Sequence, residues 1–321
     1  MLRPGYTISL GSATLSSATL EPLATLVVEC AQNAGADSAV LALGHRPDLA
    51  LSGGEPATIE LGWDGDTELV FTGTVAAVER RIDGLVVTCA GSHAALTRMR
   101  ADTTFVRQSA GQIVTALAGQ ASVVTAAIDD GVQLPVYAAD SGRSHYAHCL
   151  RLARWSGFGL YAGPDGTLTF GRYAVRAPAR TLRYGADVIR ASVRRSSAAD
   201  TATVVPESPS SSQGDETASW LVKDAAAQAG GSGTATVSAP ALRTKEAAAT
   251  AAQALADRAA SSAVGGRVEI AGAPALALGD TVALDGMPDP ELDDVYEVRG
   301  VRHVLDRRRG FRTHLRLGGT S

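Results

Sequence analysis

Alternating apolar and polar positions fill the first hundred residues and predict short β-strands. Five runs have the β-branched alternation of half-buried strands: 23–30, 38–43, 57–63, 68–79 and 85–90. Turn sequences such as Asp64-Gly65 and Asp83-Gly84 separate these runs. Five or six short strands at this spacing are typical of a sandwich or a small barrel.

A helical period replaces this alternation after residue 103. Ser109 and Gln112 form a Ser-x-x-Gln capping box in front of an apolar run, which predicts a short helix. A polar linker containing residues 129–131 follows, and a second helix is expected from about residue 144 to Gly157. Apolar segments on both sides of residues 163–166 (Gly-Pro-Asp-Gly) predict a β-hairpin. The pattern therefore predicts a helix, linker, helix and hairpin, which form a packing unit.

The remainder of the chain predicts a second all-β unit with helical material inserted. Six runs have a strand-like pattern: 186–195, 201–205, 267–270, 281–284, 295–304 and 311–317. Between the early and the late runs, residues 206–233 are rich in Ser, Pro, Gly and Gln and are predicted to be the least ordered. Thr244 is placed to cap an alanine-rich helix over 245–261. The predicted fold class is α+β, dominated by β structure.

The composition and the net charge limit the classes of protein to which the chain can belong. The chain has 321 residues, enough for two or three domains, and 45 % hydrophobic with 19 % charged residues indicates a globular protein. Its net charge of −4 argues against a dedicated nucleic-acid binder, which is usually strongly basic. Arginines cluster at 176–195 and 307–309, and we interpret these clusters as solvated faces or subunit contacts.

The cysteine spacing indicates a reducing compartment, and the hydropathy of the sequence indicates that the chain does not cross a membrane. Cys30, Cys89 and Cys149 are far apart and outside any Cys-x-x-Cys spacing, so reduced and buried thiols are expected. The first residues resemble no signal peptide, and no apolar run reaches the ~20 residues that span a bilayer. We expect synthesis in the cytoplasm.

The residues that could bind a metal or act as an acid–base pair are better explained by structural roles. His145, His148 and Cys149 lie close together on the second helix, where the histidines are expected on the flank; zinc would need four ligands, and no partner cluster is visible. Asp129-Asp130 and Asp140 fit a solvated turn better than a catalytic pair.

Other candidate motifs also lack the chemistry of an enzyme. The serines at 208–212 have no nucleophile elbow, and the glycines at 230–233 are not followed by the Lys-Ser/Thr of a phosphate loop. His303 and His314 are expected at exposed strand positions. The sequence predicts no catalytic residue, no cofactor and no metal site.

Aromatic and basic residues supply the candidates for binding surfaces, because buried aromatic anchors dominate interfaces. Trp155 is expected in the core, whereas the segment around Trp220 has little else to pack on. The interface candidates are Trp220, Trp63, Phe71, Arg307, Arg308 and Arg309.

Three groups of residues occur in an order shared with one protein family. The first is the run 70–79 after an Ile-x-Leu-Gly strand. The second comprises 104–105, 109–114, 137–140, 154–158 and 165–170. The third comprises 247–258, 272–280, 296–298 and 313–317. In this succession the chain resembles the baseplate hub proteins of contractile phage tails and injection systems. This is the late-control protein D family, which is similar to the N-terminal hub part of type VI secretion spike proteins. Residues 207–233 depart from the family's pattern.

The resemblance implies two tube-like β-barrel domains with inserted helical and hairpin modules. The implied division is a first barrel over 1–98, the helix–linker–helix–hairpin module over 99–175, the start of a second barrel over 176–206, a flexible segment with the alanine-rich helix over 207–264, and the remainder of the second barrel over 265–321.

The resemblance also implies a structural homotrimer, in which six barrels imitate sixfold symmetry toward the tail tube while the true threefold axis faces the spike. Its implied partners are other copies of itself, a spike protein, a tail tube or tube-initiator protein and other baseplate proteins, with no membrane and no sequence-specific nucleic acid. The chain ends without a downstream barrel or β-helix, so the spike is expected to be a separate polypeptide.

Two functions of other classes stay open at this point. A tail-associated cell-wall hydrolase would need a carboxylate pair at catalytic separation in a cleft. A stand-alone β-sandwich binding module would form no symmetric assembly.

Overall fold

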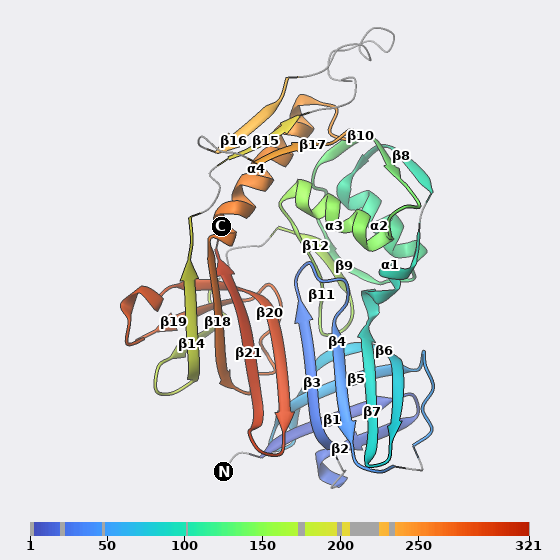
Figure 1. Cartoon of the computed structure of the whole chain (residues 1–321), viewed down its shortest axis with the longest axis vertical. Helices are drawn as coiled ribbons and strands as arrows, with labels where there is room; N and C mark the ends of the chain where they lie inside the picture. The colour runs from blue at the N-terminus through green and yellow to red at the C-terminus, as the bar shows by residue number, and fades with distance from the viewer. Residues whose placement is uncertain are drawn as a thin grey trace.

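The computed structural model describes residues 3–19, 23–46, 49–100, 102–172, 177–197, 201–205, 225–230 and 235–320. The fold is α+β and dominated by strands, as predicted, and a 13-stranded sheet forms its lower half (Figure 1). Smaller sheets and the α-helices lie above this sheet. In the described residues, no helix combines the length and the apolar character needed to cross a membrane.

The large sheet is assembled from both ends of the chain. Its N-terminal strands are β1 (Pro4–Leu10), β2 (Ala13–Ser16), β3 (Leu23–Ala31), β4 (Ser38–Leu43), β5 (Pro56–Trp63), β6 (Asp66–Arg81) and β7 (Gly84–Gly91). Its later strands are β13 (Arg180–Arg183), β14 (Val188–Arg195), β18 (Val264–Ala271), β19 (Thr281–Asp285), β20 (Val295–Asp306) and β21 (Gly310–Gly319). The main path runs β14-β18-β21-β20-β3-β4-β7-β6-β5-β1-β2, while β19 pairs with β20 and β13. Antiparallel pairing of β20 with β3 joins the two halves.

Each half of the sheet curls around its own core. Alternating burial, as along β7, turns every second side chain inward. The first core contains Ile8, Leu26, Leu41 and Ile59, and the second contains Val268, Val282 and Tyr296 among others. The two implied barrels are thus two curled halves of one continuous sheet, and the sheet includes β1 and β2, which the sequence pattern did not predict.

A helical module rises above the first half of the sheet. It comprises α1 (Ala95–Arg98), β8 (Thr103–Ser109), α2 (Ala110–Gln120), β9 (Thr125–Ile128), β10 (Gln133–Ala139), α3 (His145–Ser156), β11 (Gly159–Ala162) and β12 (Leu168–Gly171). The capping box is confirmed in both directions: Gln112 N donates to Ser109 Oγ at 3.1 Å, and Ser109 N donates to Gln112 Oε1 at 3.0 Å. Gly157 ends α3 in the left-handed conformation, with φ 71°.

The hairpin of β11 and β12 is confirmed, but the predicted polar linker is wrong. The linker contains β9 and β10, which pair with β12 and β8 respectively. These pairings join segments distant along the chain, so the local pattern did not reveal them.

A third unit lies beside this module. β15 (Thr201–Val205) pairs with β16 (Ala227–Gly230) and β17 (Ala235–Ser238) in a separate small sheet, and not with the large one. The predicted alanine-rich helix is α4 (Lys245–Ser262), and Ala247 N donates to the capping Thr244 Oγ1 at 3.1 Å. Small alanines let α4 pack closely, and they share one core with α2 and α3. α4 therefore links the upper units to the large sheet, since it also contacts β18 and β21.

Candidate assembly surfaces

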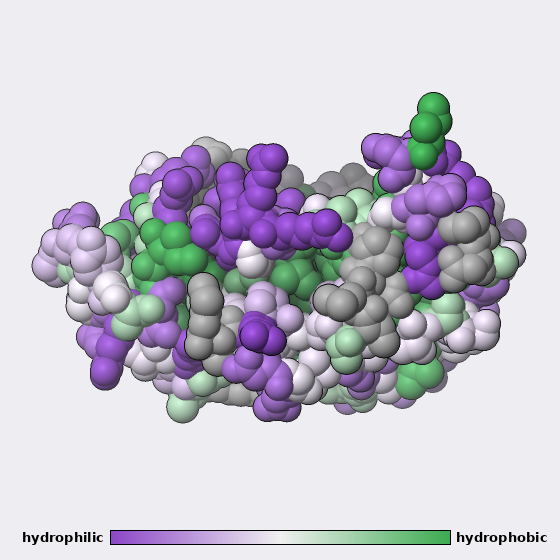
Figure 2. Space-filling model, turned by 90° about the horizontal axis from the view of Figure 1, so that it is seen from below, coloured by the Kyte–Doolittle hydropathy of each residue, from purple (hydrophilic) through white to green (hydrophobic). Residues whose placement is uncertain are grey.

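The turn between β20 and β21 presents three exposed arginines, Arg307, Arg308 and Arg309, at the lower end of the molecule (Figure 1). The backbone N–H groups of Arg309 and Arg308 donate to Asp306 Oδ1 at 2.6 and 2.8 Å, which lowers the pKa of that carboxyl group. Arg307 Nε donates to the Leu23 carbonyl oxygen at 3.1 Å. Seen from this end, hydrophilic side chains cover much of the surface, with smaller hydrophobic patches between them (Figure 2). These hydrogen bonds hold the turn in a defined conformation, and the turn presents basic side chains on this surface.

Trp63 lies where the two halves of the sheet meet. Its indole Nε1 donates to the Gly272 carbonyl oxygen at 2.9 Å, and its ring centroid is 5.6 Å from that of Phe311. Because β5 belongs to the first half and Gly272 to the second, this half-buried side chain braces the joint inside one chain.

The other aromatic candidates differ in position. Phe71 is 2 % exposed and packs in the first core, so its ring does not reach the surface of the chain. Trp220 lies outside the described residues. Trp155 is buried in the core, as predicted.

The ends of the large sheet leave backbone edges open. β14 and β2 are the end strands of the main path, and in the described part of the chain each pairs along its length with a single neighbour. Ile189 on β14 and Tyr184 just before it are 51 % and 60 % exposed. An open edge with apolar side chains is a template for pairing with another chain.

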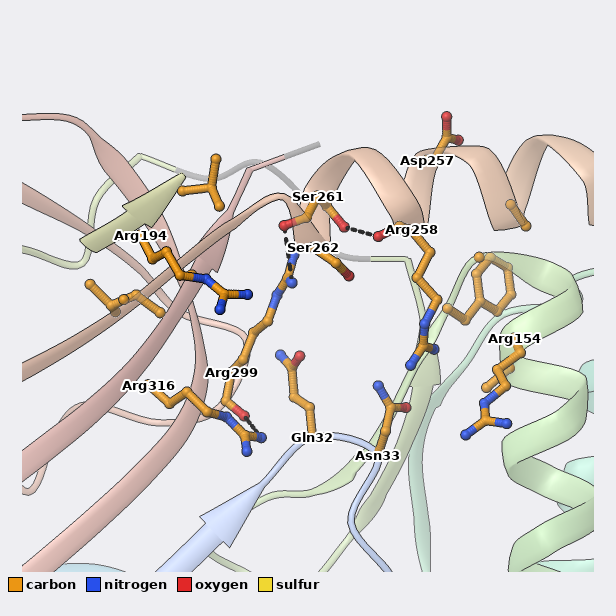
Figure 3. Close-up of a pocket in the computed structure, with 18 of the residues that line it drawn as sticks. Gln32, Asn33, Arg154, Arg194, Asp257, Arg258, Ser261, Ser262, Arg299 and Arg316 are labelled. Atoms are coloured by element: carbon orange, nitrogen blue, oxygen red, sulfur yellow. Dashed lines mark hydrogen bonds between the residues drawn. The ribbon is translucent and has the colours of Figure 1, made fainter. Parts of the chain in front are cut away.

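A cavity of about 720 Å³ lies where the helical module, α4 and the large sheet meet (Figure 3). Six arginines and one aspartate line it: Arg154, Arg194, Arg258, Arg267, Arg299, Arg316 and Asp257. These residues come from α3, β14, α4, β18, β20 and β21, so a basic site forms in a chain with net negative charge. The sequence analysis missed this site because its arginines are dispersed along the chain; only Arg194 belongs to one of the arginine clusters named there, the cluster at 176–195.

A buried polar network forms one wall of this cavity. Arg299 donates to Glu297 Oε2 at 3.0 Å, to the Ser261 carbonyl oxygen at 3.3 Å and to the Gly319 carbonyl oxygen at 2.9 Å. Gln32 Nε2 donates to the other Glu297 oxygen at 3.2 Å. Burial raises the pKa of Glu297, and Arg299 opposes that shift. The network ties β3, β20, β21 and the end of α4 together.

The histidines of α3 are buried, which corrects their predicted place on the helix flank. His148 Nε2 donates to the Asp140 carbonyl oxygen at 3.0 Å, so His148 Nδ1 accepts from the Tyr137 hydroxyl at 2.8 Å. His145 Nδ1 donates to the Leu117 carbonyl oxygen at 3.1 Å. Both residues are 0 % exposed, and their hydrogen bonds fasten α3 to neighbouring segments. Cys149 beside them is a buried free thiol.

The strand histidines also differ from the prediction. His303 is 3 % exposed and shares a hydrogen bond of 2.9 Å with Thr313 Oγ1, and burial lowers its pKa to about 4. His314 is half-buried. Asp129 and Asp130 are exposed beside Gly131, which has φ 65°, in agreement with a solvated turn. In the described residues, no group of three potential ligands is arranged to hold a metal ion.

Asp37 and His93 form a second buried polar pair, near the joint between sheet and module. Asp37 Oδ2 lies 3.9 Å from His93 Nδ1, and Asp37 Oδ1 accepts from Ala31 N at 3.1 Å. Burial raises the pKa of Asp37 to about 7 and lowers the pKa of His93 to about 4. Both shifts favour the neutral forms in the folded protein.

Replacing Asp37 with asparagine is expected to stabilise the fold at alkaline pH. The pKa of Asp37 is raised in the folded state, so its stabilising contribution is complete below pH 3.8 and is lost as the pH rises through about 7. Asp37→Asn removes that loss, which is worth up to about 4 kcal/mol at pH 8, while its benefit at pH 4 is small. Denaturant unfolding at both pH values measures the difference. A variant less stable than the native chain at pH 8 contradicts this interpretation of Asp37.

Comparisons with solved structures show the same fold in tail proteins. The 43 kDa tail protein of prophage MuSo2 from Shewanella oneidensis superposes with a TM-score of 0.73 and 16 % identity, covering 98 % of both chains. A tail protein from Neisseria meningitidis gives 0.73 and 17 % identity, covering 98 % of this chain and 96 % of that one. A component of the Escherichia coli type VI secretion system, described as similar to the tail proteins gp27 and gp5 of bacteriophage T4, gives 0.61 and 11 % identity over 98 % of this chain and 77 % of that one.

Sequence comparison assigns the family. No match was found among curated protein sequences. The sequence model of the phage tail baseplate hub (GPD) matches residues 38–308, which include most of both sheet halves and all the material inserted between them. The chain therefore belongs to the phage tail baseplate hub family, and it is a structural tail protein rather than an enzyme.

Proposed function

We propose that this hub protein forms a homotrimer that joins the sixfold tail tube to the threefold central spike of a contractile tail or injection system. One observation carries the proposal: a single sheet wraps around two separate cores in each chain. Three copies around an axis present six curled units on one side while keeping true threefold symmetry on the other. The mechanism is geometric, since the ring matches two symmetries and transmits axial load.

The open strand edges support a ring of copies. A cyclic trimer has a head-to-tail interface, in which one surface of each copy meets a different surface of the next. The β14 edge with Ile189 and Tyr184 offers one such surface. Obligate interfaces of this kind bury more than about 2,000 Å² and are more hydrophobic than transient ones.

We further propose partners at the two ends of the ring. The exposed arginines 307–309 contact the tail component at the lower end of the molecule in Figure 1, while Trp63 braces the sheet behind that surface. The partners are a spike protein, a tube or tube-initiator protein and other baseplate proteins. The protein is made in the bacterial cytoplasm and assembled into the particle.

The oligomeric state tests this proposal directly. Mass photometry at micromolar concentration should find a trimer, alone or with the co-expressed tube and spike proteins. Reading frames for tube, sheath and spike should flank its gene. A monomer that persists in the presence of both partners contradicts the proposal.

Ile189→Glu is expected to weaken the trimer at least about tenfold, because a buried charge at an apolar contact costs more than 1.4 kcal/mol. Ile82→Glu is the matched control, since Ile82 is a fully exposed isoleucine in the turn between β6 and β7, away from the β14 edge. Dilution series followed by mass photometry compare the two variants. Equal trimer stability in both would exclude the β14 edge from the interface.

A further inference from the structure

The arginines that line the cavity come from separate parts of the molecule, which a bound ligand would hold together. Arg154 comes from the last turn of α3 and Arg258 from α4, whereas Arg194, Arg267 and Arg316 come from three adjacent strands of the large sheet. The sheet pairings place Ser192 opposite Arg267 and Arg267 opposite Arg316, so the basic strand residues share one face. A ligand in the cavity would therefore contact the module, the helix and the sheet at once.

The charge of the cavity is not neutralised by its own lining. Glu297 accepts from Arg299, which also donates to two carbonyl oxygens, so Arg299 belongs to the wall. Asp257 is the one acidic residue among those that line the cavity, and it accepts from Gln253 Nε2 at 2.7 Å. Arg154, Arg194 and Arg267 are exposed to solvent. A concave site in which one charge sign predominates concentrates ligands of the opposite sign.

The arrangement of the guanidinium groups indicates the class of ligand. In Figure 3 the labelled arginines stand around the open space, and their guanidinium groups do not converge on one point. A single phosphate needs several donors at one point, whereas an extended chain with several carboxylates can meet dispersed arginines one at a time. The volume of about 720 Å³ holds a short peptide segment.

The rest of the lining also suits a peptide. Gln32 and Asn33 contribute amide groups, and Ser192, Ser261 and Ser262 contribute hydroxyl groups that can bond to a peptide backbone. Phe158 and Leu317 add apolar surface. Binding of a single nucleic-acid strand would instead call for several aromatic platforms for base stacking, and Phe158 is the one aromatic residue that lines the cavity.

We propose that this cavity is a docking site for a carboxylate-rich polypeptide segment of another tail protein. The proposal rests on the proposed function only in taking the partner to be a tail protein, and it does not require the trimer. Occupation would join the helical module to the large sheet through the ligand.

Fluorescence anisotropy with a labelled deca-glutamate peptide in 150 mM salt tests the proposal on the full chain. The double variant Arg194→Gln/Arg267→Gln is expected to bind at least about tenfold more weakly than the native protein, since it removes two charge-assisted contacts. Arg98→Gln/Arg100→Gln removes the same charge from exposed positions at the end of α1, outside the cavity, and is expected to change the affinity less than about twofold. Thermal unfolding of both variants checks that they fold, and Ser262→Glu, which adds a carboxylate to the lining, provides a second variant that should also weaken binding.

Competition separates the peptide from other anions. Unlabelled deca-glutamate should displace the probe at lower concentration than tripolyphosphate or a ten-nucleotide oligo-dT. Stronger displacement by either phosphate compound, equal loss of affinity in the two double variants, or no binding by the native protein would each overturn the proposal. Mass photometry of the same samples reads the oligomeric state separately, so a failure of the trimer is not confused with a failure of the cavity.

Discussion

Arg299→Ala is expected to lower the free energy of unfolding by about 3 kcal/mol, because it leaves a buried carboxylate without its cationic partner. The side chain of Glu297 is 7 % exposed, and Arg299 is its cationic partner at 3.0 Å. The same substitution leaves the carbonyl oxygens of Ser261 and Gly319 without their donor. Urea denaturation followed by circular dichroism measures the loss.

Arg302→Ala is the matched control on the same strand. Its contact with Glu29 spans 3.7 Å, and the two side chains are 47 % and 60 % exposed, so a change of no more than about 0.5 kcal/mol is expected. The deficit of Arg299→Ala should also shrink as the pH falls. The pKa of Glu297 is already raised by burial, and loss of Arg299 raises it further, so protonation relieves the stranded charge at low pH. A deficit that is the same at pH 5 and pH 8 would contradict a role for Glu297.

Local signals in the sequence predicted local structure well. The capping box at Ser109, the stop at Gly157 and the cap at Thr244 each depend on residues within one helical turn, and all three are confirmed. The hairpin around 163–166 depends in the same way on its turn residues. Such features need no knowledge of the rest of the fold.

Features that depend on distant partners were missed. The continuity of the sheet rests on pairing between β3 and β20, such as Thr25 with Asp306, which lie at opposite ends of the chain. β9 and β10 are short strands whose partners lie in other segments. The sequence predicts surface positions for His148 and His303, because polar residues within an apolar pattern are usually exposed. Their partners Tyr137 and Thr313 are only 11 and 10 residues away, but each lies outside the helix or strand that carries the histidine, so the local pattern does not reveal it. The arginine cavity was missed for the same reason, since its charged residues come from six separate helices and strands.

The structure gives a physical reason for the glycine in one sequence motif. The run 70–79 includes Gly73 on β6, which pairs with Gly91 on β7 and with Ala57 on β5. A Cβ at Gly73 would overlap the carbonyl oxygen of Ala90 and lie 2.9 Å from Phe71 Cζ. Both neighbours are held, the first by the sheet and the second by the core, so neither can move aside cheaply.

Gly73→Ala is therefore expected to destabilise the protein by about 3 kcal/mol or more, since overpacking against backbone forces the strands apart. Gly119→Ala is its control, because Gly119 is exposed near the end of α2 and a Cβ there meets nothing within 4 Å. Alanine favours the helix, so this control should be neutral or more stable by about 0.5 kcal/mol. Denaturant midpoints compare the two. Point substitutions ordinarily change the free energy of unfolding by about 1 kcal/mol. If Gly73→Ala changed it by no more than that, β6 and β7 would be less closely fixed than their register implies.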